Sequence, residues 1–309
     1  MLTSFFKKST VVNYIFIIAL FLICYFLQLN NTTLVKSTYS IFNSDFTRII
    51  LLLSSFFLIN FIVKRNGLTK NSSFSVLFFL LYLLLFPSIF NNTKIIFANF
   101  FLLLAYRRII SLQTLKAPKE KIFDASIWIF VASLFQLWCI IFILLVYISI
   151  LFHASRDYRN WLLPFVAFFA TSLLFIICSL IFNENWVNQI MNQIQLNFNF
   201  NFLTSNLNSI SGWIFMVFGS YFLLAMVFSV TNKPLVLQAA YKKMIFGFVF
   251  SVLIFLFNIE NNNDLLLFSF FPLSVLSTNA IEYSNNKWYK EIILWMVLIL
   301  CFGTFIYQL

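Results

Sequence analysis

The sequence predicts an all-α, polytopic integral membrane protein, and three observations lead to this fold class. Of the 309 residues, 62% are hydrophobic and only 9% are charged, which is too little charge to cover a soluble domain of this size. Apolar runs of about 20 residues, the length that crosses a bilayer as a helix, recur along the chain. These runs are continuously apolar, whereas the strands of a membrane β-barrel alternate between apolar and polar residues.

The first apolar run, near 10–28, follows the basic pair Lys7 and Lys8. A cleaved signal peptide has a positive start, a short apolar stretch and a cleavage site with small residues. Here the apolar run is too long and no such site follows it. We therefore expect an uncleaved first span, and a single transmembrane domain that occupies 1–309.

A run of 28 residues without a charge lies between Asp124 and His153. As one helix it would be about 42 Å long, against a hydrocarbon core of about 30 Å. The alternative is a short helical hairpin, 124–152, that folds back at Phe135-Gln136-Leu137. The two alternatives place everything after this run on opposite sides of the membrane.

The basic residues distinguish these alternatives, because cytoplasmic loops collect Lys and Arg. With a hairpin, all of the 20 Lys and Arg except Lys36, Arg48 and Lys94 fall on the cytoplasmic side. With one long span, the same charges divide evenly between the two sides. The charge distribution therefore predicts the hairpin, with Gln136 and Trp138 at its outer tip.

The resulting map has about 11 membrane segments, with the N-terminus in the cytoplasm and the C-terminus outside. The segments are 10–28, 46–63, 73–90, 94–113, 124–137, 139–152, 161–182, 211–230, 244–258, 265–281 and 290–308. The spans carry no acidic or basic residue at mid-depth, which argues against a proton-driven pump.

The longest polar segment, 183–210, lacks Lys and Arg and is expected to be an extracytoplasmic loop. Apolar residues alternate with Gln or Asn in its middle, and a period of two is typical of a strand with one apolar face. Such a face predicts a partner: the bilayer surface, the outer vestibule of the protein, or another chain that accepts an added strand. The alternative is a loop whose phenylalanines dip into the membrane interface. The residues of the apolar face are Ile194, Leu196, Phe198, Phe200 and Phe202.

The run from Ile49 to Asp157 has a recognisable order of parts. A span is followed by the basic turn "KRNGLTK", a span that ends in "LFPSIFNNTK", the helix "IIFANFFLLLAYRRIISLQ", the hairpin and the basic exit "HASRDYRNW". This order resembles the membrane region of GT-C glycosyltransferases, which take sugars from polyprenyl-phosphate carriers. More closely, it resembles a family of bacterial envelope proteins known only as a domain of unknown function. The resemblance implies the bacterial inner membrane and a polyprenyl-phosphate lipid as a partner.

GT-C enzymes carry an acidic residue in the first outer loop, where it acts as a base or a metal ligand. Here that loop, "LNNTTLVKSTYSIFNS", contains no acid before Asp45. The resemblance thus makes Asp45 the candidate catalytic residue, and Arg48, one helical turn later, lies on the same face. In the alternative interpretation, Asn43-Ser44-Asp45 caps the start of a helix.

Two further residues are candidates for substrate binding on the outer side. The resemblance implies that Lys94, or Arg48, would neutralise the phosphate of the carrier, and that Gln136 would line the same cavity. The alternative role of Lys94 is that of an interfacial lysine at a helix start.

Metal and cofactor sites are not expected. Cys24, Cys139, Cys178 and Cys301 lie in apolar runs without CxxC spacing, and His153 is the one histidine. The five glycines are too scattered for a phosphate-binding loop. No nucleic-acid partner is expected.

Two functions follow from this sequence. The first is a GT-C-like protein of the bacterial cell envelope, either an enzyme that handles polyprenyl-linked sugar or a non-catalytic relative. The second is a non-catalytic membrane subunit that scaffolds an envelope complex through the outer loop 183–210. Expected partners are the lipid bilayer and other envelope membrane proteins.

Overall fold

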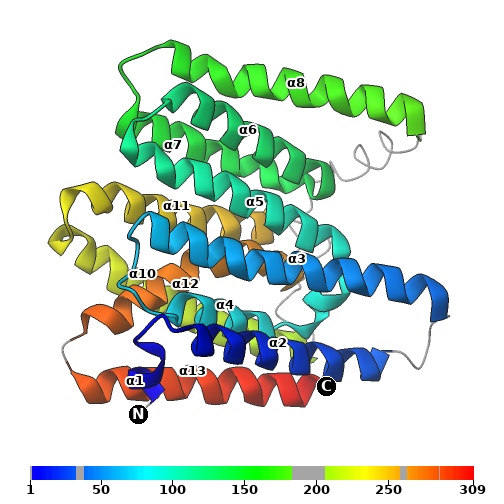
Figure 1. Cartoon of the computed structure of the whole chain (residues 1–309), viewed down its shortest axis with the longest axis vertical. Coiled ribbons are helices and arrows are strands. Elements are labelled where there is room, and N and C mark those ends of the chain that lie inside the picture. The colour runs from blue at the N-terminus through cyan, green and yellow to red at the C-terminus, as the bar shows by residue number, and fades with distance from the viewer. Residues whose placement is uncertain (1, 33–37, 183–205, 258–262, 285) are drawn as a thin grey trace.

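The computed structural model describes residues 2–32, 38–182, 206–257, 263–284 and 286–309. In these ranges the chain is a bundle of helices lying side by side, without strands (Figure 1). The α-helices are α1 (Leu2–Phe6), α2 (Val11–Thr32), α3 (Thr38–Arg65), α4 (Phe74–Leu84), α5 (Thr93–Ser111), α6 (Pro118–Phe135), α7 (Ile143–His153), α8 (Arg159–Phe182), α10 (Asn206–Ser229), α11 (Leu235–Phe257), α12 (Leu267–Tyr283) and α13 (Lys287–Gln308). Short 3₁₀ helices are η2 (Pro87–Asn91), η3 (Leu112–Thr114), η4 (Leu137–Phe142), η6 (Val230–Asn232) and η7 (Asn263–Leu266).

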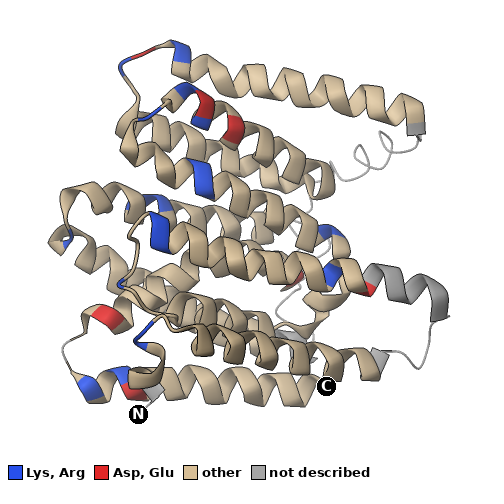
Figure 2. Cartoon of the chain, viewed as in Figure 1, with Lys and Arg blue, Asp and Glu red and all other residues tan. Residues whose placement is uncertain are grey.

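The bundle has two ends that differ in charge. The connections after α3, α5, α7, α10 and α12 lie at the end that holds α1, and we call it the basic end, because most Lys and Arg gather there (Figures 1 and 2). The turns η2, η4 and η7 lie at the opposite end. The basic residues that the sequence predicts to lie on one side of the membrane therefore do lie at one end of the bundle. That the basic end faces the cytoplasm stays a prediction.

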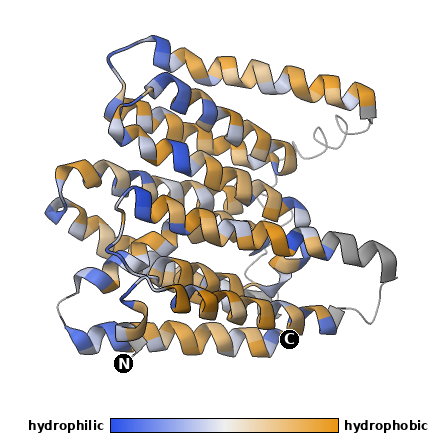
Figure 3. Ribbon diagram, viewed as in Figure 1, coloured by the Kyte–Doolittle hydropathy of each residue, from blue (hydrophilic) through white to orange (hydrophobic). Residues whose placement is uncertain are grey.

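The helices are those of a membrane protein. Among the described residues, eight helices are long and apolar enough to cross a bilayer. Helix α8 is hydrophobic along most of its length (Figure 3). Many of its large apolar side chains are exposed, for example Phe165, Phe169, Leu173 and Ile181. Water would not tolerate so large an exposed apolar surface, whereas lipid tails are its natural surroundings. The structure confirms an all-α chain with several helices that could span a membrane, and the number of 11 spans stays a prediction.

The apolar run 125–152 is not one long helix. Helix α6 ends at Phe135, and Gln136 is extended, with φ −139° and ψ 106°. The chain then returns through η4 and α7, so that Lys119 at the start of α6 forms an ion pair of 3.1 Å with Asp157 beyond α7. The hairpin turns where the sequence predicts it. Its first arm is longer than expected, because Pro118 occupies a favoured first position of a helix and α6 begins there rather than at 124.

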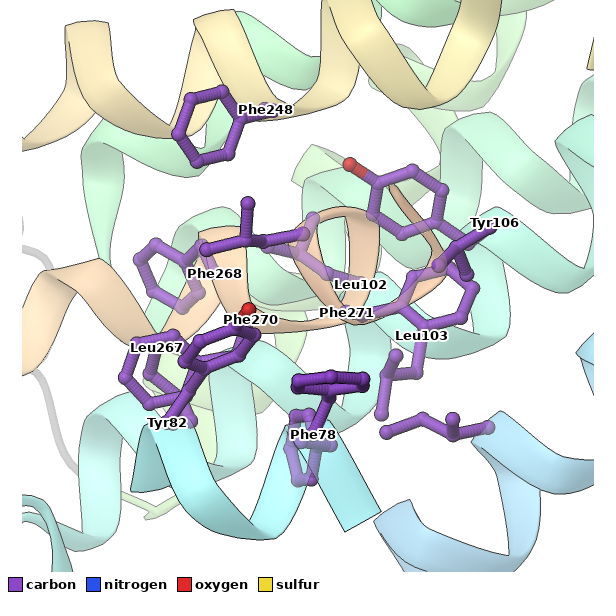
Figure 4. Close-up of a cluster of buried hydrophobic side chains, with 14 of the residues drawn as sticks. Phe78, Tyr82, Leu102, Leu103, Tyr106, Phe248, Leu267, Phe268, Phe270 and Phe271 are labelled. Atoms are coloured by element: carbon purple, nitrogen blue, oxygen red, sulfur yellow. The ribbon is translucent and has the colours of Figure 1, made fainter. Parts of the chain in front are cut away.

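Helices α4 and α12 form the centre of the bundle. Every residue of α4 is buried, as is nearly all of α12. Aromatic rings of α4, α5, α11 and α12 pack together in this core (Figure 4). With 11 residues, α4 is about 16 Å long and could not cross a bilayer in contact with lipid. It ends just before Phe86, whose φ of −131° and ψ of 77° lie outside the helical region that a following proline disfavours.

Several helices extend beyond the apolar runs of the sequence. Helices α3, α10 and α11 begin at Thr38, Asn206 and Leu235, whereas the expected segments begin at 46, 211 and 244. Residues 206–210 of the expected loop 183–210 are therefore helical. Lys243 lies inside α11, fully buried, and its Nζ donates to the carbonyl of Ile109 at 2.8 Å. Lys243 can lie inside α11 because a buried carbonyl satisfies a donor that lipid could not.

Candidate functional site

Six polar side chains from three segments meet at the end of the bundle opposite the basic end. They come from α3, from the turn between η2 and α5, and from η7. We call this group the Asn92 cluster: Asp45, Arg48, Ser88, Asn92, Thr93 and Asp264. Its central turn is part of the segment "LFPSIFNNTK".

Asp45 and Arg48 form the α3 side of the Asn92 cluster. Asp45 Oδ1 lies 2.7 Å from Arg48 Nη1, and Arg48 Nε donates to Thr93 Oγ1 at 2.8 Å. The side chains of the pair are 13% and 15% exposed. Charges so far from water need a close partner, and Asp45 supplies it for Arg48 within α3. The hydrogen bond from Arg48 to Thr93 then ties α3 to the first turn of α5. Since α3 begins at Thr38, Asp45 lies inside the helix rather than at its N-cap.

Asp264 forms the other side of the cluster, and the sequence analysis missed it. Its carboxylate accepts hydrogen bonds from Ser88 Oγ and, at 3.2 Å, from Asn92 Nδ2. Asn92 also caps α5, because its Oδ1 accepts from the N–H of Ile95 at 3.5 Å. The sequence signal for Asp264 is an acid that directly precedes an apolar run. Nothing in the sequence pairs it with a serine 176 residues away.

The other two candidate residues are near this end but are not bonded to Asp45. Lys94 is exposed at the start of α5, and Gln136 is half-buried at the hairpin tip. The ring of Phe135 stacks on Phe97 of α5 at 5.2 Å, which places the tip beside the first turns of that helix. No hydrogen bond or ion pair within the described ranges joins Lys94 or Gln136 to Asp45. Their role in substrate binding stays a prediction.

The proposed partner strand cannot be placed. Ile194, Leu196, Phe198, Phe200 and Phe202 lie outside the described residues.

The Asn92 cluster offers no evident metal site. In the part of the chain that the structure describes, no group of three or more His, Cys, Asp or Glu side chains could hold a metal ion. Both carboxylates of the cluster instead have side-chain partners, a guanidinium for Asp45 and a hydroxyl and an amide for Asp264. The chemistry of the cluster is therefore that of a polar clasp between α3, α5 and η7.

A helical bundle with lipid-facing helices, one basic end and a polar clasp at the other end defines a polytopic membrane protein. The chain belongs to a family of unknown function, DUF6427, whose model matches residues 1–308. No curated protein matches the chain. No solved structure matches it either.

Proposed function

We propose that this chain is a non-catalytic membrane subunit that scaffolds a complex of the bacterial cell envelope. In this proposal it lies in the inner membrane, with the basic end and the N-terminus in the cytoplasm and the C-terminus outside. The ion pair between Asp45 and Arg48 carries the proposal, because it occupies the acid on which a GT-C-like transferase would depend.

A general base must reach the proton that it removes, at about 2.6–3.2 Å. Asp45 Oδ1 has Arg48 Nη1 at 2.7 Å, and the carboxylate is 13% exposed. Arg48 is also occupied, since its Nε donates to Thr93. One oxygen of the acid and the guanidinium that would neutralise a carrier phosphate are therefore already engaged, and the contacts of Asp45, Arg48 and Thr93 are better suited to hold α3 against α5.

The partner surface of the scaffold is proposed to be the outer loop, with its alternation of apolar and polar residues from 194 to 202. An extended segment with one apolar face can add to a sheet of another protein or pack on its surface. This assignment rests on the sequence pattern.

The test is complementation of a deletion strain at native expression. A single Asp45→Asn change would leave Arg48 charged without its partner, so the matched variant is the double change Asp45→Asn/Arg48→Gln, which removes both charges and keeps a polar amide at each position. The scaffold proposal expects full complementation by the double variant. It expects loss of function when 195–202 is deleted.

The runner-up function, a GT-C-like transferase for polyprenyl-linked sugar, predicts the opposite result. Loss of a catalytic base costs about 10²–10⁴ in rate. A double variant that reaches the membrane at the normal level and fails to complement would overturn the scaffold proposal. Western blotting of membrane fractions supplies the expression control.

A further inference from the structure

A polar cavity lies at the basic end, away from the Asn92 cluster. It has a volume of about 400 Å³, which is within the range of small-molecule sites. Three segments that are far apart in the sequence enclose it: the N-terminal residues 3–7, the turn 70–74, and the junction between α12 and α13. We call it the lysine pocket, after four of its lining residues: Lys7, Lys70, Lys287 and Lys290.

The lysine pocket has an excess of positive charge. Glu282 is the one acidic residue of its lining, and its carboxylate is fixed by Ser72 Oγ at 2.5 Å and the N–H of Lys70 at 2.7 Å. Lys7 and Lys70 are close enough to Lys290 to repel its charge. None of the four pocket lysines forms a salt bridge with a carboxylate of the described residues. Four ammonium groups against one carboxylate leave a site that an anion would complete.

A fifth lysine lies beside the pocket, and its ammonium group lacks a hydrogen-bond partner among the described residues. Lys233 is 6% exposed, and its Nζ, which lies over the ring of Tyr283, has no hydrogen bond within the described ranges. The pKa of Lys233 is lowered to about 8, mainly by burial and also by the nearby charge of Lys70, while Glu282 opposes the shift. A bound anion would relieve this repulsion.

The position of the pocket indicates the source of the anion. The apolar spans of α2 and α13 begin at Val11 and Lys287, and that of α12 ends at Tyr283, so the pocket lies where the apolar region meets the polar end. Trp288, which is 83% exposed, lies next to Lys287, and indoles favour the headgroup level of a bilayer. Basic pockets between membrane helices at this depth suit anionic headgroups.

We propose that the lysine pocket binds a phosphate-bearing anion, and that the anion is the headgroup of an anionic membrane lipid. Lysine ammonium groups act as mobile point charges on phosphate oxygens, without the fixed geometry that an arginine fork imposes. A soluble phosphate compound offers the same chemistry from the aqueous side. This site is independent of the scaffold role and does not depend on which side the basic end faces.

The experiment measures lipid binding to the full chain by native mass spectrometry. Purified protein is titrated with phosphatidylglycerol and, separately, with phosphatidylcholine. The test variant is Lys287→Gln/Lys290→Gln. The matched control is Lys116→Gln/Lys242→Gln, which removes two exposed lysines of the basic end that do not line the pocket. Thermal unfolding of each variant shows that it is folded.

A lysine close to an anionic headgroup strengthens the binding of that lipid. Loss of two pocket lysines should therefore weaken phosphatidylglycerol binding by about 10-fold or more in the test variant. The control variant should bind within about twofold of the original chain, and phosphatidylcholine should bind weakly to all three. Equal binding of phosphatidylglycerol by the test and control variants would overturn the proposal. A titration with inorganic phosphate distinguishes a lipid headgroup from a soluble anion. If phosphate binds by itself and the test variant weakens its binding while the control variant does not, the ligand of the pocket is a soluble anion and not a lipid. If the test variant does not fold, Lys7→Gln/Lys70→Gln provides the same comparison.

Discussion

At the scale of single residues, one glycine leaves room for a buried tyrosine of a neighbouring helix. Tyr106 of α5 is buried, and its hydroxyl points toward α11 without a hydrogen-bond partner within the described ranges (Figure 4). Gly247 of α11 lies directly against that hydroxyl, so that a Cβ at this position would collide with it. The close approach of Tyr106 to α11 therefore depends on the missing side chain.

Gly247→Ala should lower the free energy of unfolding by about 1–3 kcal/mol, because the added methyl group overpacks a filled core. Adding Tyr106→Phe should restore part of the loss, since it removes the oxygen nearest to the new Cβ. The measurement is thermal unfolding in detergent. The matched control is Gly303→Ala, where a Cβ would have no atom within 4 Å and helix propensity would favour alanine. Equal unfolding temperatures for the two alanine variants would contradict this account.

At the scale of secondary-structure elements, similar apolar sequences have different roles. Helix α4 is surrounded by protein on every side, whereas α8 exposes most of its large apolar side chains. Both would be read as membrane helices from hydropathy. Because α4 is too short to span a bilayer alone, its place in the core is what makes it stable in this fold.

Replacement of a phenylalanine by alanine should therefore lower the free energy of unfolding by different amounts in the two helices. Phe79 of α4 is 0% exposed, and Phe79→Ala should lower the free energy of unfolding by about 3–5 kcal/mol through the cavity that it leaves. Phe169 of α8 is 68% exposed, and Phe169→Ala should cost well under half as much, because no packed cavity forms. Chemical unfolding in detergent compares the two. A comparable loss in both variants would mean that α8 is buried in the protein as purified.

At the scale of the whole molecule, the alternation of helix directions brings the polar connections to two ends. Ion pairs and hydrogen bonds close the basic end across long sequence separations, as between Ser72 and Glu282. At the other end, the hydrogen bonds of the Asn92 cluster likewise join segments that are far apart in the sequence. The unequal distribution of Lys and Arg between these ends predicts the orientation in the membrane.

Cysteine labelling in intact spheroplasts tests this orientation. Ser155→Cys and Asn232→Cys, both exposed at the basic end, should stay unlabelled by an impermeant thiol reagent. Asn91→Cys, exposed at the opposite end, should be labelled and serves as the control. The background carries Cys178→Ala, since the other three cysteines are buried. Labelling of the first two positions together with protection of Asn91→Cys would invert the proposed topology.

The sequence by itself determined the class of the protein, the grouping of its basic residues and the turn of the hairpin at Gln136. These features follow from composition, from the length of apolar runs and from local charge, which are all properties of consecutive residues. The same reasoning identified Asp45 and Arg48 as neighbours, because residues three apart share a helix face.

Only the tertiary structure decided which apolar helices face lipid and which form the core. Lipid tails are about as apolar as leucine, so hydropathy cannot distinguish α8 from α4. The structure alone also paired Asp264 with Ser88 and brought Lys7, Lys70 and Lys290 around one pocket. Such groupings join residues from separate helices, and their chemistry arises from helix packing that local sequence patterns do not encode.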